Sequence, residues 1–263
     1  MYRVALHNAI GLSIEALVLP RKYSLKLHTS MSAQVVELSE TVRDMRNEIC
    51  LCRISPFDAE KLRNAFQAVI RDLMLLKHDT VLFENMPPDE IDTDLHIQVE
   101  DDVSVTVDGS VSINSEDSEH IEILQSLMAV PTRNLIYNMS DLLRSCNSTL
   151  MRTLGAPEFA GGTTETDLES CLQELQTVIQ AYDTADKAVT GHEGLPKSYA
   201  SDLELVEIFL FMHPVRQAAN SILSLGTMVF EITSYRANGR RRLFFPSYPL
   251  SKAIHRVSNF CSL

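Results

Sequence analysis

Apolar residues recur along most of the chain at alternating spacings of three and four, the pattern of helices that bury one face. A first stripe extends from Leu27 to Cys52, and a second occupies residues 59–83. The Ser-Pro-Phe-Asp sequence between them supplies a helix start, with Ser55 or Asp58 as the capping side chain. These two long helices, joined by a short polar turn, predict an antiparallel helical hairpin. The first stripe comprises Met31, Val35, Leu38, Val42, Met45, Ile49 and Cys52.

Helical spacing returns near Glu119 and continues to Leu154. Pro131 predicts a kink or a restart in a helix that Gly155 closes, and a further stripe occupies residues 168–189. The last helix is expected over residues 201–236, kinked by Pro214 and buried nearly all round at its centre. The pattern predicts an all-α protein, an antiparallel bundle of about five long helices.

The segment from residue 89 to 122 is acidic and follows a different pattern. Apolar residues between Ile97 and Ile113 fall on odd positions, which is the alternation of strands, and Asp108-Gly109-Ser110 suits a hairpin turn. The same segment lacks cations and is dense in carboxylates, which favours a disordered insertion instead. Both interpretations of this acidic insertion, residues 89–118, stay open at this point.

The N-terminal apolar run, residues 9–19, is about half as long as a membrane-spanning helix and contains Glu15. Three interpretations compete: a signal peptide, an amphipathic core helix, and the C-terminal stub of a membrane helix. Pro20 ends the run, and Arg21 and Lys22 follow at once. Cations directly beyond an apolar segment are typical of the cytoplasmic side of a membrane helix, which favours the stub.

Charge is distributed unevenly along the chain. The formal net charge is −12, yet 14 acidic residues and no Lys or Arg lie between Lys77 and Arg133. The rest of the chain therefore has slightly more bases than acids. An acidic protein of this kind is a poor candidate for binding nucleic acid, and we expect none as a partner.

The sequence contains none of the glycine-rich, metal-binding or nucleophile motifs that identify enzymes. The five cysteines include a C-x-C pair, Cys50 and Cys52, without a histidine pair at zinc spacing. His213 is best explained as a core histidine, and Cys171 has no partner in the sequence that would activate it. We expect no catalytic site, no metal and no cofactor, and the prediction is that the protein is not an enzyme.

A basic and then aromatic stretch stands near the C-terminus. Three arginines, Arg240–Arg242, are followed by Phe244, Phe245 and Tyr248. Cations beside aromatic residues are typical of a segment at the level of lipid headgroups. The alternative is a solvated basic tail.

The order of these features resembles a known family. The segments are LVLPRK, LESCLQELQTVIQAYDTAD, DLELVEIFLFMHPVRQAANSILSLGTMV and RRRLFFPSYPLSKAI. Together they look like the cytosolic helical region between the membrane halves of fungal fusaric-acid-resistance-like transporters. This group includes putative endoplasmic-reticulum transporters related to brefeldin A sensitivity proteins and is distantly similar to aromatic-acid exporters and plant malate channels.

The resemblance implies a fragment of a membrane transporter for organic anions or similar solutes, in which this domain has an assembly or regulatory role. It would lie on the cytoplasmic face of the endoplasmic reticulum or plasma membrane. Its partners would be the membrane surface, the absent membrane-spanning halves and, as a further arrangement, a second copy in a homo-oligomer. A free-standing helical adaptor or tether, bound to membranes through its basic end, is the alternative.

The resemblance also divides the chain into a membrane-helix stub (1–22), a cytosolic bundle (23–236) and a juxtamembrane segment (237–263). The residues expected at the membrane surface are Arg21, Lys22, Arg240, Arg241, Arg242, Phe244, Phe245 and Tyr248.

Overall fold

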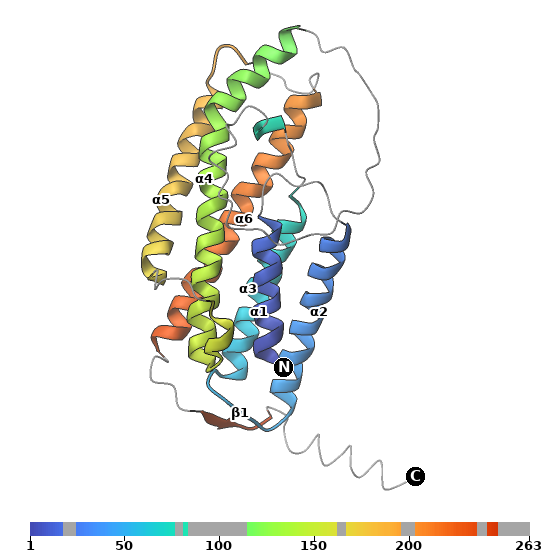
Figure 1. Ribbon diagram of the computed structural model, residues 1–263, viewed down its shortest axis with the longest axis vertical. Helices are drawn as coiled ribbons and strands as arrows, with labels where there is room; N and C mark the ends of the chain where they lie inside the picture. Colours follow the sequence, from blue (N-terminus) through green and yellow to red (C-terminus); the bar gives the residue numbers. More distant parts are fainter. Residues whose placement is uncertain are drawn as a thin grey trace.

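The computed structural model describes residues 1–17, 25–76, 81–83, 115–161, 167–195, 203–235 and 241–246. Within them the chain is all-α, as predicted, with one two-stranded ribbon (Figure 1). The helices are α1 (Tyr2–Ala16), α2 (Leu25–Asn47), α3 (Pro56–Met74), α4 (Ser115–Leu154), α5 (Leu168–Thr190) and α6 (Leu203–Ser234). Short 3-10 turns are η1 (Val81–Phe83) and η3 (Pro157–Phe159), and the strands are β1 (Cys50–Cys52) and β2 (Arg242–Phe244).

The helices run alternately up and down along one axis (Figure 1). α1, α2 and α3 pack on one another, and α4, α5 and α6 form a second group of three. α3 against α6 and α1 against α4 join the two groups into one core. At 40 residues, α4 is about 60 Å long and extends along much of the bundle.

The predicted apolar stripes form this core. Leu38 of α2, Phe66 of α3, Leu142 of α4 and Leu175 of α5 are all fully buried. The α6 stripe is buried as well, through Ile222, Leu225, Val229 and Ile232. Helical periodicity therefore located a buried face in each predicted helix. The expected burial nearly all round the centre of α6 was wrong, because Leu210 and His213 are exposed there.

Several predicted boundaries were wrong. The first helix ends at Asn47 rather than Cys52, because residues 50–52 form a strand, and Ile49 is exposed instead of buried. The second ends at Met74 rather than Phe83. Ser55 caps α3 by accepting from the Asp58 amide at 3.0 Å, so this predicted cap is confirmed.

Two prolines lie inside continuous helices. α4 starts at Ser115 and continues through Pro131 without a restart, and α6 continues through Pro214. His213 is exposed, so its assignment as a core histidine was wrong. The predicted hairpin between Ile97 and Ile113 lies outside the described residues.

α1 is part of the common core. Its buried face, with Ala5, Leu6, Ala9 and Ile10 fully covered, packs against α2, α3 and α4. This is the packing expected of an amphipathic core helix, one of the three interpretations of the N-terminal run. The domain boundaries at residues 22 and 236 stay predictions.

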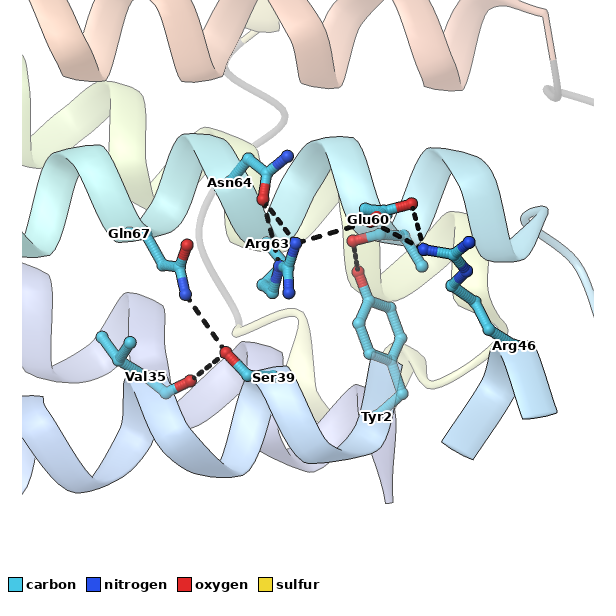
Figure 2. A network of polar contacts seen from close by, with 9 residues as sticks. Tyr2, Val35, Ser39, Arg46, Glu60, Arg63, Asn64 and Gln67 are labelled. Atoms are coloured by element: carbon cyan, nitrogen blue, oxygen red, sulfur yellow. Dashed lines mark hydrogen bonds and ion pairs between the residues drawn. The ribbon is translucent and has the colours of Figure 1, made fainter. Parts of the chain in front are cut away.

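A polar seam joins α2 to α3 (Figure 2). Arg46 donates to both carboxylate oxygens of Glu60, at 2.9 and 3.0 Å. The Gln67 amide donates to the Ser39 hydroxyl at 3.1 Å. These side chains bridge the two antiparallel helices. Arg46 and Glu60 are near the end where α2 leads into β1, and Ser39 and Gln67 lie farther along the bundle (Figure 2).

A buried carboxylate joins α3 to α6, across the two groups of helices. Asp72 is 1% exposed and accepts hydrogen bonds from Arg71, Gln217 and Ser221. A buried carboxylate is costly unless it is paired, and three donors satisfy this one. Because the donors on α6 are two specific side chains, the contact also favours one register of α3 on α6.

α5 is held to α6 by an ion pair and a buried hydroxyl. Arg216 binds Asp183 with both arms of its guanidinium, at 2.5 and 2.8 Å. Hydrogen bonds from Arg216 lower the pKa of Asp183. Next to this pair, the buried Tyr182 hydroxyl donates to the Met212 carbonyl at 3.1 Å.

Asp183→Asn should therefore lower the free energy of unfolding by about 0.5–1 kcal/mol at neutral pH, since both partners are partly exposed to solvent. A carboxyl with a lowered pKa in the folded state stabilises above its unfolded pKa of about 4 and loses that contribution as the pH falls further. Urea unfolding at several pH values should show the variant and the parent converging below pH 4 or so. Asp186→Asn, exposed on the same helix, is the control; an equal loss there would contradict the assignment.

Candidate membrane-facing surface

The basic and aromatic C-terminal stretch forms a β-ribbon with residues 50–52. β1 and β2 are antiparallel, with Cys50 opposite Phe244, Leu51 opposite Leu243 and Cys52 opposite Arg242. The ribbon lies at one end of the bundle, near the N-terminus of α1 and beyond the end of α6 (Figure 1). Residues almost two hundred positions apart therefore form one surface.

The outer face of the ribbon is apolar. Leu51 and Leu243 are opposite each other and 59% and 54% exposed. Side chains alternate between the faces of a strand, so Ile49 and Phe245, two residues along on each chain, continue this face. They are 62% and 70% exposed. We refer to Ile49, Leu51, Leu243 and Phe245 as the ribbon tip.

Cations flank the ribbon tip. Arg241 and Arg242 are both exposed, directly before Leu243. A guanidinium keeps its charge at every physiological pH and matches phosphate oxygens in a two-pronged geometry. The surface thus combines exposed aliphatic and aromatic groups with phosphate-binding cations.

The inner face of the ribbon carries two half-buried thiols. The Cys50 and Cys52 sulfurs lie 3.6 Å apart, on the same side of β1. The Cys52 thiol donates to the Ile54 carbonyl at 2.9 Å. Ile54 is fully buried, so the strand is anchored in the core immediately after it leaves the ribbon.

Two arginines, one in α1 and one directly after β1, donate to carbonyls at the end of α4 and just beyond it. Arg53 donates to the Thr153 carbonyl at 3.4 Å, and Arg3 donates to the Gly155 carbonyl at 3.1 Å. The last carbonyls of a helix lack intrahelical partners and carry partial negative charge, so cations stabilise them. β1 and α1 are therefore both anchored at the C-terminus of α4.

A second contact holds α1 at this end. His7 shares a hydrogen bond with Asn147 at 3.1 Å and packs on the Phe159 ring, with centroids 5.2 Å apart. Asn147 also donates to the Phe159 carbonyl at 2.9 Å. Asn147 stands in a glycosylation sequon, and the structure gives it a packing role between α4 and η3.

The structure brings together four of the predicted surface residues: Arg241, Arg242, Phe244 and Phe245. Phe244 is on the inner face, half-buried. The other four lie outside the described residues: Arg21, Lys22, Arg240 and Tyr248. Leu17, the last described residue before Arg21, is buried at the end of α1 opposite the ribbon (Figure 1).

Sequence reasoning missed Ile49 and Leu51 as surface residues. Ile49 fits the helical spacing of the preceding stripe, and Leu51 lies off that stripe. The available signal was the composition of residues 49–54, Ile-Cys-Leu-Cys-Arg-Ile, in which apolar and β-branched residues crowd directly before the Ser-Pro start of the next helix. Pairing with residue 243 could not be predicted, because no local pattern connects segments so far apart.

Reactive chemistry is limited in the described part of the chain. No group of three or more metal-binding side chains occurs there. Burial raises the pKa of the Cys146 thiol, and Cys171 nearby adds to the rise. Burial likewise raises the pKa of Cys171. Thiols kept protonated in this way are poor nucleophiles.

Among the described helices, none combines the length and the apolar character needed to cross a bilayer. No protein-family model matches this chain, and searches of curated proteins and of solved structures find no significant match.

A substitution at Gly155 tests whether Arg53 holds the base of the ribbon. It has a φ of +73°, and a Cβ there would lie 2.8 Å from Cζ of Arg53. Gly155→Ala should cost about 1–2 kcal/mol in the free energy of unfolding, through the left-handed backbone and the displaced guanidinium. Hydrogen exchange of residues 50–53 should also accelerate.

Gly11→Ala is the matched control, because nothing lies within 4 Å of its Cβ position, inside α1. Alanine is the better helix former, so this variant should gain up to about 1 kcal/mol. If Gly155→Ala is as stable as the parent and residues 50–53 exchange unchanged, Arg53 does not hold the ribbon.

Proposed function

We propose that this chain is a helical domain that docks on an anionic lipid surface through the ribbon tip and its flanking arginines. The observation that carries the proposal is the exposed pair Leu51 and Leu243, set opposite each other in the ribbon. A solvent-facing, cross-strand apolar pair beside two exposed arginines is suited to the boundary between lipid headgroups and acyl chains.

The magnitudes favour reversible binding. Each arginine near an anionic leaflet contributes roughly 1 kcal/mol. Apolar groups contribute about 0.8 kcal/mol for each CH₂ that leaves water. Either component alone binds weakly, and stable attachment generally needs two signals. The ribbon places cations and exposed apolar side chains side by side.

The placement of charge supports one orientation. η1 and the start of α4, the described elements on either side of the carboxylate-rich segment, lie toward the end of the bundle opposite the ribbon (Figure 1). An anionic surface attracts the arginine-bearing end and repels carboxylates. The domain would therefore stand on its ribbon, with the described ends of the helices on either side of this segment away from the lipid.

On the family resemblance, we further propose that the domain belongs to a membrane transporter for organic anions or similar solutes. Its role there is assembly or regulation on the cytoplasmic face, next to the membrane-spanning halves. Docking by the ribbon would hold the helices close to the bilayer.

A free-standing adaptor or tether is the second candidate. It is favoured by α1, whose fully buried Leu6 and Ile10 make it an integral helix of the bundle. Both candidates use the same lipid-facing surface, and they differ in whether that surface is the chain's sole attachment to the membrane.

Arg241→Ala with Arg242→Ala should weaken binding to phosphatidylserine-containing vesicles by roughly thirtyfold, from the loss of about 2 kcal/mol. Leu51→Ser with Leu243→Ser should weaken it by at least about tenfold while leaving its salt dependence in place. Co-flotation with vesicles at graded salt concentrations measures both effects.

Lys26→Ala with Lys187→Ala is the matched control. Both lysines are exposed, at the N-terminal end of α2 and near the C-terminal end of α5, and the pair removes the same charge away from the ribbon. If the control weakens flotation as much as the arginine variant, binding depends on overall charge alone. If the parent protein does not float with anionic vesicles, or self-associates through the ribbon instead, lipid docking is wrong.

A further inference from the structure

The C-x-C pair lies on β1, the strand that also carries Leu51. A small change in the backbone of this strand would therefore alter the ribbon tip. The Cys50 and Cys52 sulfurs are 3.6 Å apart, close to van der Waals contact. Their partners across the ribbon are Phe244 and Arg242. A bond between the sulfurs would therefore form directly beneath the Leu51–Leu243 pair.

The two ribbon thiols, Cys50 and Cys52, are half-buried, whereas the other two described cysteines, Cys146 and Cys171, are buried within the bundle. Thiol–disulfide exchange requires access for an attacking or a leaving sulfur. Among the described cysteines, the ribbon pair meets this requirement best.

We propose that Cys50 and Cys52 form an oxidation site, at which a small disulfide such as oxidised glutathione converts the two thiols into an intrastrand disulfide. One thiolate attacks the glutathione disulfide, releases the first glutathione thiol and forms a mixed disulfide. The second thiolate then displaces the other glutathione. The two protein thiols lose two protons and two electrons, and one glutathione disulfide becomes two glutathione thiols.

Closing the disulfide must bring the two sulfurs from 3.6 Å to about 2.05 Å. Alternate residues of an extended strand have Cα atoms about 6.6 Å apart, near the long end of the about 4.4–6.8 Å that disulfides usually span. We therefore expect the bond to contract or bend β1 between Cys50 and Cys52, which would shift the partners of β2.

The consequence for lipid binding rests on the proposed function. Reduced β1 presents Leu51 opposite Leu243, beside the arginines. The oxidised, contracted strand loses this register, so the apolar tip is dispersed. Oxidation should then weaken docking without removing any charge.

Tryptic digestion gives a direct readout, because cleavage after Arg46 and Arg53 places both thiols in one peptide, Asn47–Arg53. After treatment of the native protein with oxidised glutathione, this peptide should lose two hydrogens and resist alkylation. The backbone amides of residues 241–246 should exchange hydrogen faster, and affinity for phosphatidylserine vesicles should fall about tenfold or more. Dithiothreitol should reverse all three changes.

Cys50→Ser with Cys52→Ser is the control variant. It keeps the ribbon and the remaining cysteines, and it should bind vesicles like the reduced parent before and after oxidant. A stable glutathione adduct, an alkylatable Asn47–Arg53 peptide, or a disulfide that leaves exchange in residues 241–246 unchanged would each overturn the proposal. Failure of the reduced parent to bind vesicles refutes lipid docking, while the peptide and exchange measurements still judge the thiol switch.

Discussion

The pairing of β1 with β2 is the contact on which the functional account depends. It joins three residues after α2 to three residues after α6, and it sets Leu51 opposite Leu243. An isolated two-stranded ribbon is marginal in water, so this one needs support from the bundle. Fully buried Ile54 and the contact of Arg53 with the end of α4 provide it. The surface exists because the core has already brought these segments together.

The up-and-down arrangement of helices explains why one end of the molecule collects the relevant groups. An odd-numbered helix starts at this end and an even-numbered helix finishes there (Figure 1). α1 therefore brings Arg3 to the Gly155 carbonyl, directly after α4, and the chain continues from α6 into β2. Asp72, bound by Gln217 and Ser221, favours one register of α3 on α6. The helices that flank the two strands are thereby held in a fixed relation.

Periodicity predicts the helices well because burial of one face repeats every three to four residues, whatever the neighbours are. Leu38, Phe66 and Leu142 were placed in the core on this basis and are fully buried there. The Ser55 cap was equally predictable, since it depends on residues within one turn.

Non-local contacts account for the part that could not be predicted. Ile49 and Cys52 fit the helical stripe, and the competing strand gains its stability from residues 242–244, far along the chain. Pro131 and Pro214 lie inside helices that each pack against several others, a tertiary context that local propensity does not register. The basic and aromatic residues of the proposed surface were predicted from the sequence. Its aliphatic residues became apparent only from the pairing of the two strands.

A single introduced indole tests the central claim, that the ribbon tip enters the headgroup boundary of an anionic membrane. The chain contains no Trp, so Phe245→Trp supplies one fluorophore at the tip. Leu25→Trp, at a similarly exposed position on the N-terminal end of α2, is its counterpart far from the ribbon. With phosphatidylserine vesicles that contain brominated lipids, emission from position 245 should shift to the blue and be quenched, and emission from position 25 should not change. Equal quenching at both positions, or none at position 245, would contradict the account.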